Sequence, residues 1–135
     1  MKVMTTGRCL CGAIQFSVAR PFEYAGYCHC SRCRRASGSA FAAFAGVRRE
    51  NVHIEQGPDD VVTYRRNPDT VSHLCRHCGS VLFLVVRQEQ YAHVQMGTLV
   101  EDPQIRPQFH IYVAAKASWH EITDGLPQFA GLPNR

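Results

Sequence analysis

The sequence has no apolar run long enough to cross a lipid bilayer, which takes about 20 consecutive apolar residues. Residues 1–7 contain none of the apolar core that a secretory signal peptide requires. No apolar pattern at helical spacing extends beyond two turns, which argues against a helical bundle. These absences predict a cytoplasmic protein without a membrane partner.

The chain also lacks low-complexity segments and linkers. Its 135 residues, 45% of them hydrophobic, suit one compact domain with a single core. We therefore expect residues 1–135 to form a single domain.

Short segments of β-branched and aromatic residues recur between Gly, Pro, Asn and Asp. Ile14, Phe16 and Val18 alternate with polar residues, which is typical of a half-buried strand. Residues 80–86 are apolar after the first, which is typical of a central strand covered on both faces. Further strands are expected at 40–45, 51–56, 61–66, 71–75, 91–96 and 109–114.

One short helix is expected over residues 31–38, with Ser31 as its N-cap and Gly38 just after its last turn. The pattern as a whole predicts a mainly β, mostly antiparallel fold with one or two short helical turns.

Seven cysteines are the most informative feature, and an odd number cannot form a disulfide framework without leaving one unpaired. In a reducing compartment metal ligation becomes their leading use. A structural zinc takes four protein ligands, whereas a catalytic zinc takes three and keeps one position open, so seven divides into four and three. The thiols fall into three groups: Cys9-Leu-Cys11, Cys28-His-Cys30-Ser-Arg-Cys33 and Cys75-Arg-His-Cys78.

Local sequence indicates which four belong together. Gly12 and Gly79 each follow the last cysteine of their group, whereas Arg34 follows Cys33, the last cysteine of the remaining group. A glycine there lets the backbone turn tightly and aim amides at sulfur. We expect a structural zinc that joins the beginning of the chain to its middle and closes a long loop, on Cys9, Cys11, Cys75 and Cys78.

Cys28, Cys30 and Cys33 would then bind a second, catalytic zinc whose fourth position is kept for a substrate. One alternative is a second structural zinc, closed by one of four histidines: His73, His93, His110 or His120. Another is a CxxC redox pair, although the strand followed by a long helix that such a pair needs is lacking.

Three thiolates make zinc a weak Lewis acid and favour a soft fourth ligand, so we expect the substrate that binds there to be a thiol. Coordination deprotonates a thiol, whose free pKa is about 8.5, and so provides a nucleophilic sulfur at neutral pH. We expect Arg32, Arg34 and Arg35 to offset the negative charge and to hold carboxylates of the thiol. His29 and His77 lie between ligands and are expected to point away from the metal.

The basic charge balance does not indicate a nucleic-acid partner. Seven thiolates holding two Zn²⁺ ions would lower the formal charge by three, from +4 to +1. The arginines cluster only at 32/34/35, 48/49 and 65/66, which is weak as a groove-binding face.

Five segments together resemble the glutathione-dependent formaldehyde-activating family, whose domain is shared with centromere protein V: residues 7–13, 28–38, 75–79, 107–112 and 116–129. The resemblance implies a zinc-stitched β fold, also described as a β-tent, with one four-cysteine structural zinc and one three-cysteine catalytic zinc. It also implies an activity that joins formaldehyde to glutathione, giving S-hydroxymethylglutathione, and that is classed as a carbon–sulfur lyase in the reverse sense.

The first hypothesis is therefore a zinc-dependent carbon–sulfur lyase-type enzyme that adds an aldehyde such as formaldehyde to a small, glutathione-like thiol. Its catalytic residues would be Cys28, Cys30 and Cys33. The competing hypothesis is a non-enzymatic module with two structural zincs that binds protein or nucleic acid. A third function, zinc storage or thiol sensing, shares the open site and lacks turnover. The sequence predicts no oligomeric state.

Overall fold

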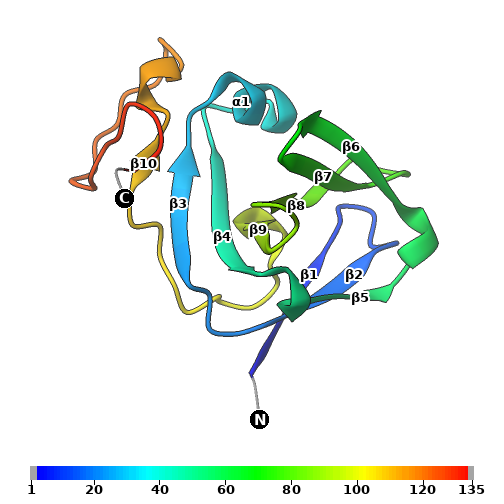
Figure 1. The fold of residues 1–135 in the computed structure, drawn as a ribbon. Helices are drawn as coiled ribbons and strands as arrows, with labels where there is room; N and C mark the ends of the chain where they lie inside the picture. Colours follow the sequence, from blue (N-terminus) through cyan, green and yellow to red (C-terminus); the bar gives the residue numbers. More distant parts are fainter. Residues whose placement is uncertain (1–2, 134–135) are drawn as a thin grey trace.

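The computed structural model describes residues 3–133, and this part of the chain forms two β-sheets and one α-helix (Figure 1). The smaller sheet has the strand order β1-β2-β5, and the larger has the order β10-β3-β4-β9-β8-β7-β6. The strands are β1 (Met4–Arg8), β2 (Gln15–Ala19), β3 (Tyr24–Cys28), β4 (Ala42–Arg48), β5 (Val52–Gln56), β6 (Val61–Asn67), β7 (Thr70–Cys75), β8 (Val81–Val86), β9 (Tyr91–Gln95) and β10 (His110–Ile111).

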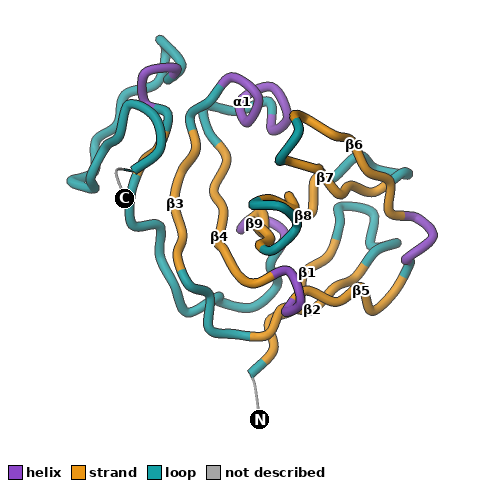
Figure 2. The backbone as a smooth tube through the Cα atoms, viewed as in Figure 1, coloured by secondary structure: helices purple, strands orange, loops and turns teal. Residues whose placement is uncertain are grey.

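The helix α1 spans Ser31–Ser37, between β3 and β4, and lies at the end of the larger sheet where those two strands meet it (Figure 2). Four single-turn 3₁₀ helices complete the described elements: η1 (Arg49–Asn51), η2 (Pro58–Asp60), η3 (Met96–Thr98) and η4 (Val113–Ala115). No helix in residues 3–133 is long and apolar enough to span a membrane.

Paired strands run antiparallel everywhere except between β3 and β10. The predicted mainly β, mostly antiparallel fold is therefore confirmed. Strand β8 lies inside the larger sheet, and residues 82–86 are buried in succession, as expected of a strand covered on both faces.

The sequence pattern does not predict β1 or β3, each of which contains a glycine, a residue that is depleted in strands. In both strands an aromatic ring occupies the space that a side chain would need. A Cβ on Gly7 would lie 2.2 Å from the Phe16 ring, and one on Gly26 would lie 2.5 Å from the Phe109 ring. The strand expected over 109–114 is shorter than predicted, since the chain leaves β10 at Tyr112, which has a φ of 56°.

The main core lies between the two sheets, where Phe16 of β2 and Phe83 of β8 meet edge to face with ring centroids 5.9 Å apart. A second, smaller core cluster includes Phe44 of β4 and Ile111 of β10. Two of its other members are Cys28 and Cys33, so the sheet, the helix and the C-terminal segment all pack around these thiols.

Candidate functional site

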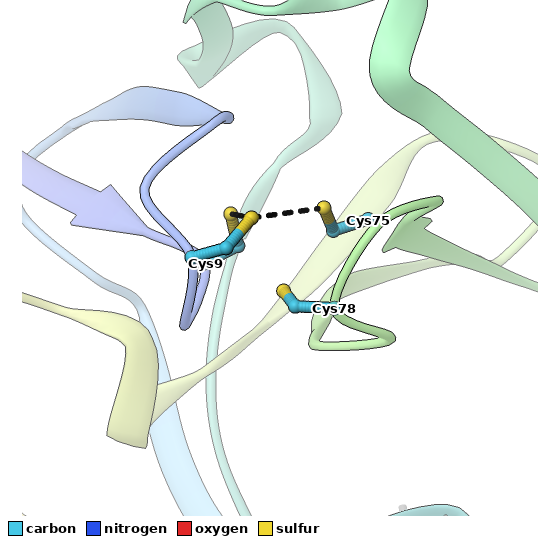
Figure 3. A group of neighbouring side chains, drawn as sticks. Cys9, Cys75 and Cys78 are labelled. Carbon is cyan, nitrogen blue, oxygen red and sulfur yellow. Dashed lines mark hydrogen bonds between the residues drawn. The ribbon is translucent and has the colours of Figure 1, made fainter.

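Four sulfurs from two turns that are distant in sequence converge on one point (Figure 3). Cys9 and Cys11 lie between β1 and β2, Cys75 ends β7, and Cys78 lies in the turn before β8. All four sulfurs lie within 4.8 Å of one another, and the Cys9–Cys11 and Cys11–Cys75 separations are 3.6 and 3.7 Å. Tetrahedral zinc with bonds of about 2.3 Å separates its sulfurs by about 3.8 Å. This quartet therefore fits a tetrahedral thiolate-bound metal ion.

The backbone of both turns has the conformation expected from their glycines. Gly12 and Gly79 have φ values of 81° and 79°, in the left-handed region that glycine adopts without strain. In the first turn the Ile14 amide donates to Cys9 Sγ at 3.3 Å. Such amides stabilise the thiolate form that metal ligation needs.

Ser80, which the sequence interpretation missed, joins the two turns of the quartet. Its Oγ accepts a hydrogen bond from the Leu10 amide at 2.9 Å and lies 3.2 Å from Cys78 Sγ. The Ser80 hydroxyl and backbone amide lower the pKa of Cys78 to about 5. His77 points away from the sulfurs, as expected, with its Nε2 2.8 Å from Asp60 Oδ1.

The other three cysteines form a second cluster, the triplet, where β3 meets α1. Cys28 ends β3, Cys30 precedes α1, and Cys33 lies within the helix, with all three sulfurs within 4.8 Å of one another. Side-chain contacts from Cys28 and Cys33 lower the pKa of the Cys30 thiol, while contacts from Cys30 and Cys33 raise that of Cys28. The three thiols are therefore electrostatically coupled, and a metal bound there would take them in their deprotonated form.

The predicted helix cap is wrong by one residue. Cys30, not Ser31, is the N-cap of α1, because its Sγ accepts a hydrogen bond from the Cys33 amide at 3.3 Å. The other end matches the prediction, since Gly38 follows the last turn with a φ of 65°. One cysteine of the triplet therefore also fixes the start of the helix that carries the next one.

Among residues 3–133, no histidine or carboxylate joins the triplet as a fourth ligand. The four histidines considered for that role all lie outside the cluster: His73, His93, His110 and His120. The seven-residue length of α1 also fails to provide the long helix of a CxxC redox pair. The structure thus groups the thiols as four and three, while their ligation of zinc and the catalytic role of the triplet stay predictions.

The triplet lies in the wall of a pocket of about 730 Å³, a size typical of small-molecule sites. Much of the wall is aromatic or aliphatic, with Tyr24, Phe44 and Phe109 among its residues. No cysteine of the quartet lines this pocket within the described part of the chain. A smaller cavity of about 350 Å³ reaches both Cys33 and Cys78. The triplet therefore borders the larger space in which a ligand can be bound.

Arg66 of β6 contacts the triplet directly, which the sequence interpretation did not anticipate. Its Nη1 donates to Cys33 Sγ at 3.6 Å, and its Nε donates to Ser72 Oγ at 2.8 Å. In the sequence Arg66 stands out only as part of the pair Arg65/Arg66, and this pair does not predict a contact with Cys33. The approach of β6 to α1 depends on the order of strands in the sheet.

The arginines that were expected to serve the triplet differ in their positions. Arg32 lines the pocket, whereas Arg35 is exposed and does not line it. Arg34 donates from Nε to the carbonyl of Ala115 at 3.2 Å, so it ties α1 to the C-terminal segment. A further arginine, Arg87, lines the pocket from the end of β8.

A chain of side chains joins the triplet loop to the C-terminal segment. His29, between two triplet cysteines, is fully buried, and its Nε2 lies 2.8 Å from His110 Nδ1. His110 Nε2 in turn lies 3.0 Å from an Asp124 carboxylate oxygen. For neutral rings, the ionised Asp124 fixes His110 as the acceptor from His29. Because neither histidine lines the pocket, this network supports a structural role for His110 rather than general acid catalysis.

The fold and the two clusters define a β protein with two thiolate-rich candidate metal centres, one of them beside a pocket. The family pattern described as glutathione-dependent formaldehyde-activating enzyme matches residues 4–115, and the chain belongs to this family.

A Halomonas elongata protein named as a candidate glutathione-dependent formaldehyde-activating enzyme is 26% identical over 142 residues, covering 98% of this chain and 90% of that protein. The crystal structure of a Rhodobacter sphaeroides protein superposes with a TM-score of 0.61 at 25% identity, covering 76% of this chain and 91% of that one.

Proposed function

We propose that the protein is a zinc-dependent enzyme that adds an aldehyde such as formaldehyde to a small thiol of the glutathione type, a carbon–sulfur lyase reaction in the reverse sense. The observation that carries this proposal is the placement of a three-sulfur cluster in the wall of the 730 Å³ pocket. Membership of the glutathione-dependent formaldehyde-activating family supports the same substrates.

Thiolate-only ligand sets favour zinc over hard cations such as Mg²⁺ or Ca²⁺. Cys28, Cys30 and Cys33 would hold the catalytic ion, and the quartet would hold a structural one. When bound, the catalytic zinc would keep the incoming thiol deprotonated at neutral pH. Because all seven cysteines are free thiols, we also propose a reducing, cytoplasmic location.

The chain's own residues have three tasks in this reaction. The aromatic wall of the pocket excludes water around the reacting sulfur. Arg66, through its contact with Cys33 Sγ, offsets negative charge as a further thiolate arrives. The sulfur forms its bond to the aldehyde carbon while the carbonyl π pair moves to oxygen, and the proton that this oxygen takes up balances the one lost by the thiol.

Two cysteine replacements test the proposal by separating the sites. Cys30→Ser is expected to abolish aldehyde-dependent thiol consumption and to lower bound zinc from two ions to one per chain, with the circular dichroism spectrum retained. The fold should persist because serine is itself a good N-cap for α1. Cys78→Ser is expected to unfold the protein, since loss of a structural ligand forfeits folding energy.

A single zinc per wild-type chain would contradict the proposal, as would full turnover in Cys30→Ser. Two tightly bound zincs with no turnover on any aldehyde and thiol would instead favour the non-enzymatic module.

A further inference from the structure

We propose that Arg87 is a specificity residue that binds a carboxylate of the thiol substrate, and that Asp69 positions it. This inference rests on the proposed function, which supplies the thiol substrate. It adds that the pocket would select this substrate by its carboxylate.

Arg87 begins a turn with an unusual backbone. Arg87, Gln88 and Glu89 have φ values of 54°, 55° and 67°, three consecutive non-glycine residues in the left-handed region. That region is disfavoured for residues with a side chain, so the surrounding structure must hold the turn in place. The Asp69 carboxylate does so, because its two oxygens accept hydrogen bonds from the Arg87 amide at 3.2 Å and the Gln88 amide at 2.8 Å.

The held turn places the Arg87 guanidinium over two aromatic rings. Its Cζ lies 4.7 Å from the Tyr91 ring centroid and 5.4 Å from that of Tyr24, within the range of cation–π contacts. Stacking orients a planar guanidinium while leaving the N–H groups at its edge able to bind a carboxylate. Among residues 3–133 no carboxylate lies within ion-pair distance of it, although Asp69 bonds its backbone amide.

The charges of the pocket wall favour an anionic ligand. Arg32, Arg66 and Arg87 line it together with one carboxylate, Asp69, whose oxygens already accept two amides. Arg66 is engaged with the triplet and with Ser72, and Arg32 is exposed on α1. Arg87 differs from the other two in combining both properties: stacking orients its guanidinium, and its side chain has no hydrogen-bond acceptor among the described residues.

A half-buried histidine lies beside Arg87 in the pocket wall. His93 also lines the pocket, and burial together with the positive charge of Arg87 lowers its pKa to about 4. His93 is therefore neutral at pH 7, so the positive charge of the pocket wall comes from its three arginines.

The test compares Arg87→Met with Arg48→Met in the zinc-loaded protein. Arg48 is a matched control, because its Cζ lies 5.2 Å from the centroid of the same Tyr91 ring, yet it does not line the pocket. Binding is measured calorimetrically for glutathione, for S-methylglutathione, which keeps the carboxylates without a free thiol, and for cysteamine, which has a thiol and no carboxylate.

Arg87→Met is expected to weaken glutathione and S-methylglutathione about tenfold or more, the usual effect of losing a charge-assisted hydrogen bond, and to leave cysteamine unchanged. Arg48→Met should leave all three affinities unchanged. Asp69→Ala should weaken the two carboxylate ligands while Asp69→Asn, which keeps one acceptor oxygen, restores part of the affinity. Because Asp69 acts through the turn, its replacement should leave cysteamine binding unchanged.

The inference would be overturned if Arg87→Met and Arg48→Met bound glutathione equally well. It would also be overturned if Arg87→Met weakened cysteamine as much as it weakened glutathione. Neither result would argue against binding of the thiol itself. Conversely, Arg87-dependent binding of S-methylglutathione as tight as that of glutathione would support carboxylate recognition and refute the role of the thiol in the proposed function.

Discussion

Single residues at the ends of elements set the geometry of both cysteine clusters. Cys30 is an N-cap as well as a member of the triplet, and Gly12 and Gly79 turn the backbone beside the quartet. The tight turns at the two glycines could be predicted from the sequence, because glycine is the residue that most readily adopts a positive φ. The cap could not, since Ser31 is the better cap by type and only the position of the sulfur decides in favour of Cys30.

Gly79→Ala tests the quartet turn at the residue scale, with Gly97→Ala as its matched control. Neither glycine has a heavy atom within 4 Å of an added Cβ, but only Gly79 has a positive φ, 79°. We expect Gly79→Ala to lower the free energy of unfolding by about 1 kcal/mol through backbone strain. Gly97→Ala should change it little. Urea unfolding of the zinc-loaded proteins measures both, and equal effects would show that the turn is not strained.

At the scale of elements, the quartet bridges the two sheets. The β1–β2 turn belongs to the smaller sheet and the β7–β8 turn to the larger, and Cys11 and Cys75 are 64 residues apart. A covalent cross-link closing a loop of that length would stabilise the fold by about 4 kcal/mol in the chain-entropy model. A metal ion held by the quartet would therefore join the two sheets, which the strand topology alone leaves as separate hydrogen-bonded units.

The C-terminal segment is attached to the triplet loop by the hydrogen-bonded side chains of His29, His110 and Asp124. Asp124→Asn removes the carboxylate facing His110, whose side chain is only 3% exposed. Asp102→Asn is the control, because Asp102 pairs with Arg106 on the surface, where both side chains are exposed. We expect Asp124→Asn to lower the melting temperature more than Asp102→Asn, since replacing a charged acceptor by a neutral amide weakens the bond to a buried ring more than it weakens an exposed ion pair.

Equal melting temperatures of the two variants would contradict this role of Asp124. Hydrogen exchange adds a local readout, because the Asp124→Asn change should speed exchange at residues 109–112 and leave residues 81–86 protected.

Across the whole molecule, the sequence predicted local features better than neighbours in space. The cysteine groups, their glycines and the alternating strands could be recognised because spacing and residue type determine them within a few positions. The pocket wall could not be predicted, since Arg66, Asp69 and Arg87 come from β6, its turn and the end of β8. Their approach to α1 depends on the strand order, which no short segment encodes.

If the triplet keeps a coordination position for a thiol, titrating thiols into the cobalt-substituted protein will reveal it. We expect glutathione to increase the sulfur-to-cobalt charge-transfer absorption of the wild-type protein until one thiol is bound per chain. A spectrum that no thiol changes, with two cobalt ions bound per chain, would instead show that both sites are already closed and that no position is kept for a substrate.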